Sequence, residues 1–257
     1  MEFLSYVLDS KTAVITINRP KANALSSALL EELDALLTEL EGNQEVRVIV
    51  IKGEGRFFSA GADIKEFTSF TSGVQFAEMA KRGQKLFERM EQFPKPIIAS
   101  IHGAALGGGL ELAMSCHIRL VSENAKLGLP ELQLGIIPGY AGSQRLTKYV
   151  GSSFAAEMMF TSEPITGVEA VKRGLANHAY PEETLFEETM KLAKKIEKKS
   201  PASLKAVIQL LNYSKSNRFY EGVNEEANLF GQVFDTKDAK EGIQAFIEKR
   251  EPIFKGE

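Results

Sequence analysis

The segment HGAALGGGLELAMSC, residues 102–116, places Glu111 in an apolar run directly after three consecutive glycines. Both features cost free energy, because an ionised carboxylate loses its hydration on burial and glycine is a poor helix former. One interpretation is a tightly packed turn that leaves a single glutamate at the surface. The other is a site that glycine main chain and Glu111 build together.

Strand and helix patterns alternate on both sides of this segment. Strands are predicted where β-branched residues cluster, at residues 13–17, 46–53, 97–101 and 118–121. The first of these is predicted to form a hairpin with residues 7–8. Apolar residues at helical spacing predict helices over residues 26–41, with Ser26 as N-cap, and over 74–93. This alternation indicates an α/β fold whose parallel strands are covered by helices.

Beyond Tyr140 the strand signals fade and helix starts follow one another. TGVE at residues 166–169 is a capping box, and PEET at 181–184 and SPAS at 200–203 are two further starts. We therefore expect the last third of the chain to be a mostly helical extension.

Composition and charge narrow the class of protein. The chain has 257 residues, enough for a sizeable core, and a formal net charge of -3, which argues against broad nucleic-acid or anionic-membrane binding. Cys116 is the only cysteine, so no intrachain disulfide can form, and a reducing compartment is expected. The start MEFLSYVLDS lacks the features of a signal peptide, and no apolar run approaches the roughly 18 residues of a membrane span. We expect a cytoplasmic protein.

Common catalytic motifs are missing from the sequence. The glycine clusters carry neither the Lys-Ser/Thr of a P-loop nor the G-x-G-x-x-G of a dinucleotide fold, and no G-x-S-x-G elbow occurs. His102, His117 and His178 have no metal-ligand spacing with acidic residues or cysteine. Nucleotide hydrolysis, hydride transfer and metal catalysis all lose support.

Two segments share a local design in which a strand end enters a turn of small residues. They are FFSAGADIKEF, residues 57–67, and IHGAALGGGLELA, residues 101–113, which continues into a helix. N–H groups from two such turns, aimed at one point, would form an oxyanion hole. The alternative is two tight strand-to-helix turns without a further role.

Two glutamates lie in apolar surroundings. Glu111 falls in the first turn of its helix, and Glu131 lies in LGLPELQLGIIPG, residues 127–139. Two such acids tend to acquire separated pKa values, so that one donates a proton while the other accepts one. The alternative is two partly exposed glutamates at helix or loop ends.

The residues as a whole resemble the crotonase family, also called the enoyl-CoA hydratase/isomerase family. The resemblance rests on NRPKANAL, FFSAGADIKEF, PKPIIASIHGAALGGGLELAMSCHIRL, GLPELQLGIIPGYAGSQRL and EGIQAFIEKR, which occur in family order along essentially the whole chain. It implies an α/β fold of the ClpP/crotonase-like class, with a spiral core of ββα units. Residues 1–190 would form this core with the active site, and residues 191–257 a C-terminal helical oligomerisation region.

The resemblance also implies an acyl-CoA substrate and a reaction. Ala62 and Gly108 match the family's oxyanion hole, whose main-chain N–H groups hold the thioester carbonyl. Glu111 and Glu131 match the two acids of the hydratases, Glu111 taking a proton from water and Glu131 giving one to the α-carbon. Gly139 matches a glycine that positions the water. The implied reaction is reversible hydration of trans-2-enoyl-CoA in fatty-acid oxidation, without metal or other cofactor.

Residues that would bind CoA follow from the same resemblance. They are Lys21, Ala22, Ala60, Asp63, Ile64 and Lys65, joined by Phe246 and Lys249 reaching the CoA of a neighbouring subunit. Family members are usually homotrimers, often paired into homohexamers, and neither nucleic acid nor membrane is an expected partner.

The sequence departs from the family pattern near the acyl pocket. Leu129 stands where well-known hydratases have glutamine, Tyr140 where a small residue is frequent, and RPKANAL is one residue shorter than usual. Both acids remain in place. The alternatives are a Δ3,Δ2-enoyl-CoA isomerase, which needs one acid, or another crotonase reaction, and a non-catalytic CoA- or RNA-binding homologue.

Overall fold

A six-stranded sheet in the order β1-β2-β3-β4-β6-β9 forms the centre of the computed structural model, which describes residues 1–69, 71–214 and 218–257. Its strands are β1 (Leu4–Asp9), β2 (Thr12–Ile17), β3 (Val48–Gly53), β4 (Ile97–Ile101), β6 (Ile118–Ser122) and β9 (His178–Tyr180). β1 pairs antiparallel with β2, and the other neighbours are parallel. The hairpin, the three further strands and the α/β class are confirmed, whereas β9 was not predicted.

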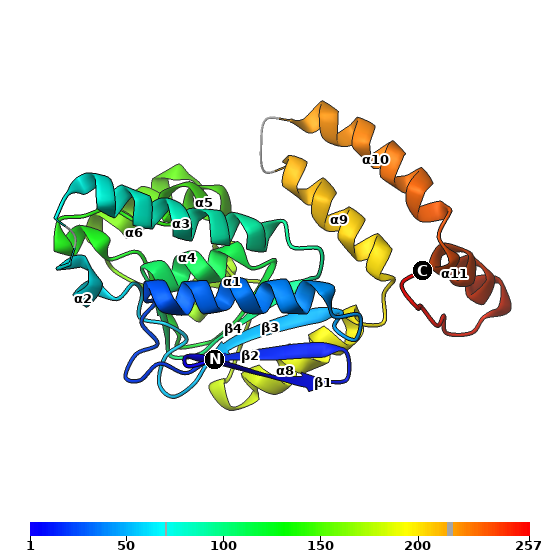
Figure 1. Cartoon of the computed structure of the whole chain (residues 1–257), viewed down its shortest axis with the longest axis horizontal. Helices are drawn as coiled ribbons and strands as arrows, with labels where there is room; N and C mark the ends of the chain where they lie inside the picture. The colour runs from blue at the N-terminus through cyan, green and yellow to red at the C-terminus, as the bar shows by residue number, and fades with distance from the viewer. Residues whose placement is uncertain (70, 215–217) are drawn as a thin grey trace.

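Helices cover both faces of this sheet because alternate strand residues point to opposite sides. Ile49 and Ile51 of β3 join the larger apolar cluster, and Val48 and Val50 join a smaller one that contains Leu185. The larger cluster lies under α1 (Ser27–Gly42), α3 (Gly73–Glu91) and α4 (Gly108–Ser115), and α8 (Glu182–Ile196) covers the other face (Figure 1). β3 and β4 are consequently buried almost throughout.

A second, three-stranded sheet stands next to the first. Its order is β5-β7-β8, formed by β5 (Ala104–Leu106), β7 (Lys126–Gly128) and β8 (Ile165–Thr166). Only the turn at His102 and Gly103 separates β4 from β5. Strands this short carry no readable alternation, which is why the sequence did not predict them.

Side-chain caps fix two of the helix starts that the sequence marked. Ser26 Oγ accepts a hydrogen bond of 3.2 Å from the N–H of Leu29, and Thr166 Oγ1 accepts one of 3.2 Å from Glu169. The remaining helices of the core are α2 (Ile64–Phe67), η1 (Glu131–Leu134, a 3-10 helix), α5 (Gly142–Val150), α6 (Ser152–Thr161) and α7 (Gly167–Lys172).

The C-terminal helices extend away from the core. They are α9 (Pro201–Ser214), α10 (Phe219–Phe234) and α11 (Lys237–Glu248) (Figure 1). The helical extension is therefore confirmed, while the predicted boundary after residue 190 falls inside α8, and the division into two regions stays a prediction. In the described ranges, no helix is both long and apolar enough to cross a membrane.

Gly103 offers a test of how the two sheets are joined. Its φ is +60°, and a Cβ there would lie 1.9 Å from the carbonyl oxygen of Arg56. We predict that Gly103→Ala lowers the free energy of unfolding by about 2–4 kcal/mol, measured by urea denaturation, because both the backbone and Arg56 must shift. Gly73→Ala is the matched control, since a Cβ at Gly73 meets open space and should change stability by less than about 0.5 kcal/mol. Equal effects of the two substitutions would contradict this account.

Candidate active site

Glycines bring the two small-residue turns into main-chain contact. The turn after β3 pairs with the segment after β4, as Ser59 N–H donates to Ala104 at 3.1 Å and Leu106 N–H donates to Ser59 at 3.0 Å. A Cβ at Gly109 would lie 2.4 Å from the Ser59 carbonyl oxygen, and one at Gly61 would lie 2.8 Å from that of Leu106. The triple glycine therefore allows two backbones to approach where no side chain would fit.

Ala62 and Gly108 come close together at this contact. A Cβ on Gly108 would lie 3.2 Å from the backbone nitrogen of Ala62. The bridge to Leu25 uses the Gly61 carbonyl and the Asp63 N–H, so the Ala62 N–H stays outside it. Gly108 begins α4, where N–H groups have no intrahelical acceptor. Both residues line one cavity, the arrangement that an oxyanion hole requires.

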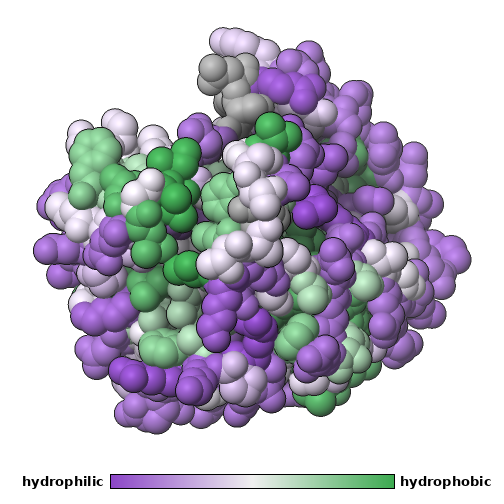
Figure 2. Space-filling model, turned by 60° about the vertical axis from the view of Figure 1, so that its left-hand side comes forward, coloured by the Kyte–Doolittle hydropathy of each residue, from purple (hydrophilic) through white to green (hydrophobic). Residues whose placement is uncertain are grey.

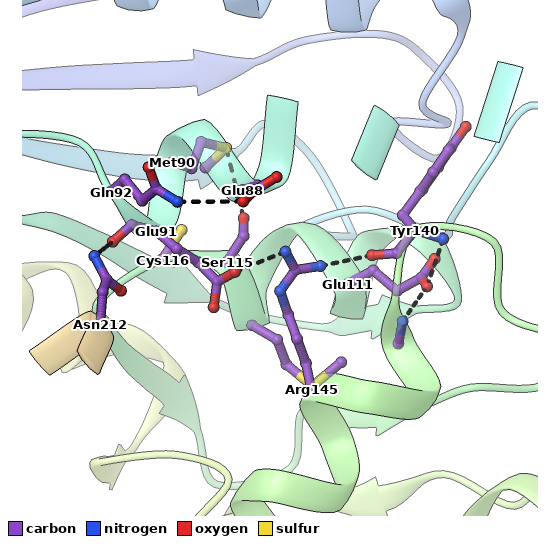
Figure 3. Close-up of polar contacts among 12 residues, drawn as sticks. Glu88, Met90, Glu91, Gln92, Glu111, Ser115, Cys116, Tyr140, Arg145 and Asn212 are labelled. Carbon is purple, nitrogen blue, oxygen red and sulfur yellow. Dashed lines mark hydrogen bonds and ion pairs between the residues drawn. The ribbon is translucent and has the colours of Figure 1, made fainter. Parts of the chain in front are cut away.

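Glu111 is buried in the first turn of α4, with 1% of its surface exposed. Its Oε1 accepts hydrogen bonds from the N–H groups of Tyr140, at 2.8 Å, and Gly142, at 2.6 Å (Figure 3). Burial, and after it the neighbouring Glu131, raise the pKa of Glu111 to about 7. The two N–H groups and Arg145 act in the opposite direction and lower this pKa. Within the described residues both donors use Oε1, so Oε2 is left to act on a ligand.

Glu131 begins η1 and lines the same cavity. Burial raises the pKa of its carboxyl above the usual range. Its Oε2 is buried with no hydrogen-bond partner among the described residues, while a Cβ at Gly107 would lie 3.1 Å from its Oε1. Glu111, Glu131, Ala62 and Gly108 thus line one space, and burial raises the pKa of both carboxyls.

The rest of this cavity, of about 100 Å³, is largely apolar. Its walls include Ile64, Phe67, Phe76, Met79, Ala80, Leu134, Ile136, Ile137 and Tyr140. With the α2 side of the molecule turned forward, Figure 2 shows apolar side chains gathered on one part of a mostly hydrophilic face. A cavity with apolar walls and a few polar groups suits a ligand whose reactive end is polar and whose tail is not.

Residues predicted to contact CoA fall into groups. Ala60 and Ile64 line the cavity, and Ala22 accepts the N–H of Ala60 at 2.9 Å. Lys21 and Lys65 are exposed close to them in sequence. Asp63 was also predicted to contact CoA. Its side chain caps α2 and forms an ion pair with the Arg19 guanidinium at 2.5 Å, and both contacts shape the turn itself.

The α11 residues predicted to contact CoA lie outside this group. Phe246 is 85% exposed and Lys249 caps the end of α11, and neither lines the cavity of its own chain. Their predicted contact with a neighbouring subunit's CoA stays a prediction.

Sequence reasoning missed the groups that support the site. Arg145 is buried, donates to the Tyr140 carbonyl at 2.6 Å and pairs with Glu91 at 2.8 Å (Figure 3). Gln84 donates to the carbonyl of Gly139, the predicted water-positioning residue, at 2.8 Å. Gly139 lines the cavity. For Arg145, the only signal in the sequence was a charged residue near the start of a predicted helix. Hydrophobic periodicity does not tell whether such a side chain points into the core.

Metal and cysteine chemistry gain no support from the described part of the chain. Nowhere in it do three or more His, Cys, Asp and Glu side chains form a group that could hold a metal ion. Cys116 is buried, which raises the pKa of its thiol to about 12, as for a core residue. The absence of a cofactor stays a prediction.

Known proteins are similar over the whole chain. The family model described as enoyl-CoA hydratase/isomerase matches residues 9–257. A probable enoyl-CoA hydratase of Bacillus subtilis is 56% identical over 259 residues, 100% of each chain, and a short-chain-enoyl-CoA hydratase of Clostridium acetobutylicum is 40% identical, with 97% of each chain covered. A solved enoyl-CoA hydratase structure from Bacillus anthracis matches with a TM-score of 0.94 at 37% identity, covering 99% of this chain and 100% of that one.

The raised pKa of Glu111 predicts a pH-dependent stability. Between the ordinary value of 4.5 and about 7, the native carboxyl holds a proton that the unfolded chain releases, so wild-type stability falls as pH rises through this window. Glu111→Gln has no carboxyl to titrate and lacks this loss. Its free energy of unfolding, measured by urea denaturation, should therefore rise relative to that of wild type by about 1–3 kcal/mol between pH 5 and pH 8. Glu163→Gln, at an exposed carboxyl, should track the wild type. A constant gap between Glu111→Gln and wild type would contradict the assignment.

Proposed function

Since the chain belongs to the enoyl-CoA hydratase/isomerase family of the crotonase superfamily and is a hydro-lyase, we propose that it hydrates trans-2-enoyl-CoA reversibly to 3-hydroxyacyl-CoA. The observation that carries the proposal is the pair of buried carboxyls, Glu111 and Glu131, lining one cavity with the amides of Ala62 and Gly108. We place this reaction in fatty-acid β-oxidation and in the cytoplasm.

The two amides would hold the thioester oxygen. Addition at C3 moves negative charge onto this oxygen as an enolate forms. The N–H groups of Ala62 and Gly108 are fixed by the main-chain contact between their turns, so they need not reorganise when the charge develops. Each such donor is typically worth about 100–1000-fold in rate.

The carboxyls would divide the proton transfers. Water lies between them, and Glu111 takes its proton on Oε2 as the water oxygen bonds to C3. Glu131 then gives its proton to C2, the enolate electrons form the new C–H bond, and the thioester carbonyl returns. One proton has been accepted and one donated, so exchange between the carboxyls restores the starting state. The N–H of Gly139 would help to hold the water.

The direction of addition follows from where the carboxyls lie. Glu111 and Glu131 line the same cavity, and Glu131 is close enough to raise the pKa of Glu111. A planar enoyl group in the cavity would meet both of them on one face. We therefore propose syn addition, in which the hydroxyl and the new hydrogen arrive from the same side.

The remaining substrate contacts would come from the rim and from a neighbouring subunit. Lys21 and Lys65 are exposed near Ala60, where cationic groups suit the pyrophosphate of CoA. The helices α10 and α11 expose Phe230, Phe234 and Phe246, an apolar surface that favours assembly as a homotrimer or a hexamer of paired trimers. In such an assembly Phe246 and Lys249 would reach the CoA of the next subunit.

An isomerase would need only one of the acids, whereas both acids here line the cavity, Glu111 buried and Glu131 half-buried with a buried Oε2. Crotonyl-CoA, incubated with the purified protein, should lose its enoyl absorbance through hydration. Turnover of a 3-enoyl-CoA without any hydration would favour the isomerase instead.

We predict that removing either acid abolishes most hydration while the fold persists. Glu111→Gln and Glu131→Gln should each lower kcat for crotonyl-CoA by about 100–10,000-fold, because one proton transfer loses its group. Glu163→Gln, on the exposed surface, is the control and should keep wild-type rates. Full hydratase activity in Glu131→Gln would remove Glu131 from the mechanism.

The pH profile of kcat/KM is predicted to be bell-shaped. Glu111 must be ionised to accept a proton, so the rate should fall about tenfold per unit below its pKa of about 7. Glu131 must be protonated to donate, so the rate should also fall as pH rises and this carboxyl, whose pKa burial raises, loses its proton. Initial rates with crotonyl-CoA from pH 5 to 10 test this, and a flat profile between pH 5 and 7 would contradict the role of Glu111.

A further inference from the structure

Tyr140, a departure from the family pattern, has a side chain that the proposed mechanism does not use. Only its main-chain N–H contacts Glu111. Its ring is buried, packs edge-on against Phe87 with centroids 5.4 Å apart, and its hydroxyl donates to Met79 Sδ at 3.2 Å. The ring is therefore held along its edge and at its tip, and it lines the cavity.

Gly83 makes room for this ring. A Cβ at Gly83 would lie 2.4 Å from both Cδ1 and Cε1 of Tyr140, far inside contact distance. Glycine in a helix interior costs about 0.5–1 kcal/mol relative to alanine, and Gly83 lies in the middle of α3. On the other side, a Cβ at Gly108 would lie 3.3 Å from Tyr140 Cε2. The ring thus fills the space between α3 and the N-terminus of α4.

Two residues that the ring contacts, Met79 and Gly83, also line a second hollow. This hollow, of about 360 Å³, lies between α1 and α3 and is lined by Leu30, Gly83 and Leu86, among others. Met79 lines both spaces. Because Tyr140 lines the cavity and contacts Gly83 and Met79, its ring and the Met79 thioether form the partition between the two.

The position of the partition matters for the acyl tail. With the thioester oxygen at Ala62 and Gly108 and C3 between the carboxyls, the tail beyond C3 must enter the apolar part of the cavity. Tyr140 lies beside both Gly108 and Glu111, so its ring faces the first carbons of that tail. A longer tail would need the space that the ring occupies.

We propose that the Tyr140 side chain determines acyl-chain length, closing the cavity toward the hollow between α1 and α3 so that short enoyl-CoA substrates are preferred. This inference rests on the proposed hydratase function. It assigns two separate roles to one residue, since the main chain of Tyr140 holds Glu111 and its ring limits the substrate.

The wild-type enzyme gives the first measurement. Each buried CH₂ adds about 0.8 kcal/mol of hydrophobic binding, so an open pocket would favour a long tail. We expect the opposite, a kcat/KM for crotonyl-CoA at least about 10-fold above that for trans-2-decenoyl-CoA. Equal or higher values for the decenoyl substrate would overturn the inference and leave the hydratase function intact. Hydration of neither substrate would contradict the function itself.

Substitutions at the partition give the second measurement, the ratio of kcat/KM for decenoyl-CoA to that for crotonyl-CoA. Tyr140→Ala should raise this ratio by about 10–100-fold, whereas Tyr140→Phe, which keeps the ring, should leave it within about threefold. In the double variant Tyr140→Ala with Gly83→Leu, the leucine side chain on α3 fills the space that the ring has left. This variant should therefore lower the ratio again.

A purely structural role predicts other outcomes. If Tyr140 only stabilised the fold, Tyr140→Ala would lower both rates alike and leave the ratio unchanged, which would overturn the inference. Circular dichroism would show whether Tyr140→Ala folds. If it does not, Tyr140→Leu is the variant to use, because leucine keeps an apolar side chain in the core but is shorter than the tyrosine ring. An unchanged ratio in folded Tyr140→Leu would also overturn the inference, and a raised ratio would support it.

Discussion

The main-chain contact between the turn at residues 57–62 and the segment at residues 104–109 is the constraint on which the site depends. Hydrogen bonds at Ser59 join the two, and Gly61 and Gly109 leave no side chain between them. Without this contact, Ala62 and Gly108 would not line the same cavity. The poor helix propensity of the glycines is the cost of a close approach that no larger residue permits.

Main-chain N–H groups of Tyr140 and Gly142 offset the cost of burying the acid of Glu111. Desolvation drives the Glu111 carboxyl toward its neutral form, and Glu131 acts in the same direction. The N–H groups of Tyr140 and Gly142, with Arg145 behind them, act in the opposite direction. The balance leaves the pKa near neutrality, where a carboxyl both accepts and releases protons readily. Stronger hydrogen bonds from these donors would lower the pKa of Glu111 further and make its carboxylate a weaker base. Weaker hydrogen bonds would raise the pKa and leave the carboxyl protonated.

Much of the fold and part of the site could be predicted from sequence because the signals were local. β3 and β4 are continuous apolar runs, Ser26 and Thr166 are capping residues, and Glu111 stands out in an apolar helix. The short strands β5, β7 and β8 carry too few residues for any period. Arg145 and Gly83 acquire meaning only through partners distant in sequence, Glu91 and Tyr140. Such contacts form only when the core is assembled. A short stretch of sequence does not contain both partners and therefore cannot predict them.

Position 140 joins two functions through different atoms of one residue. The peptide nitrogen that binds Glu111 belongs to the backbone, which every amino acid except proline supplies in the same form. The ring that contacts Gly83 belongs to the side chain, which every amino-acid substitution at this position changes. On the proposed roles, a point mutation at position 140 alters the space available to the acyl tail while the backbone contact to Glu111 is inherited unchanged.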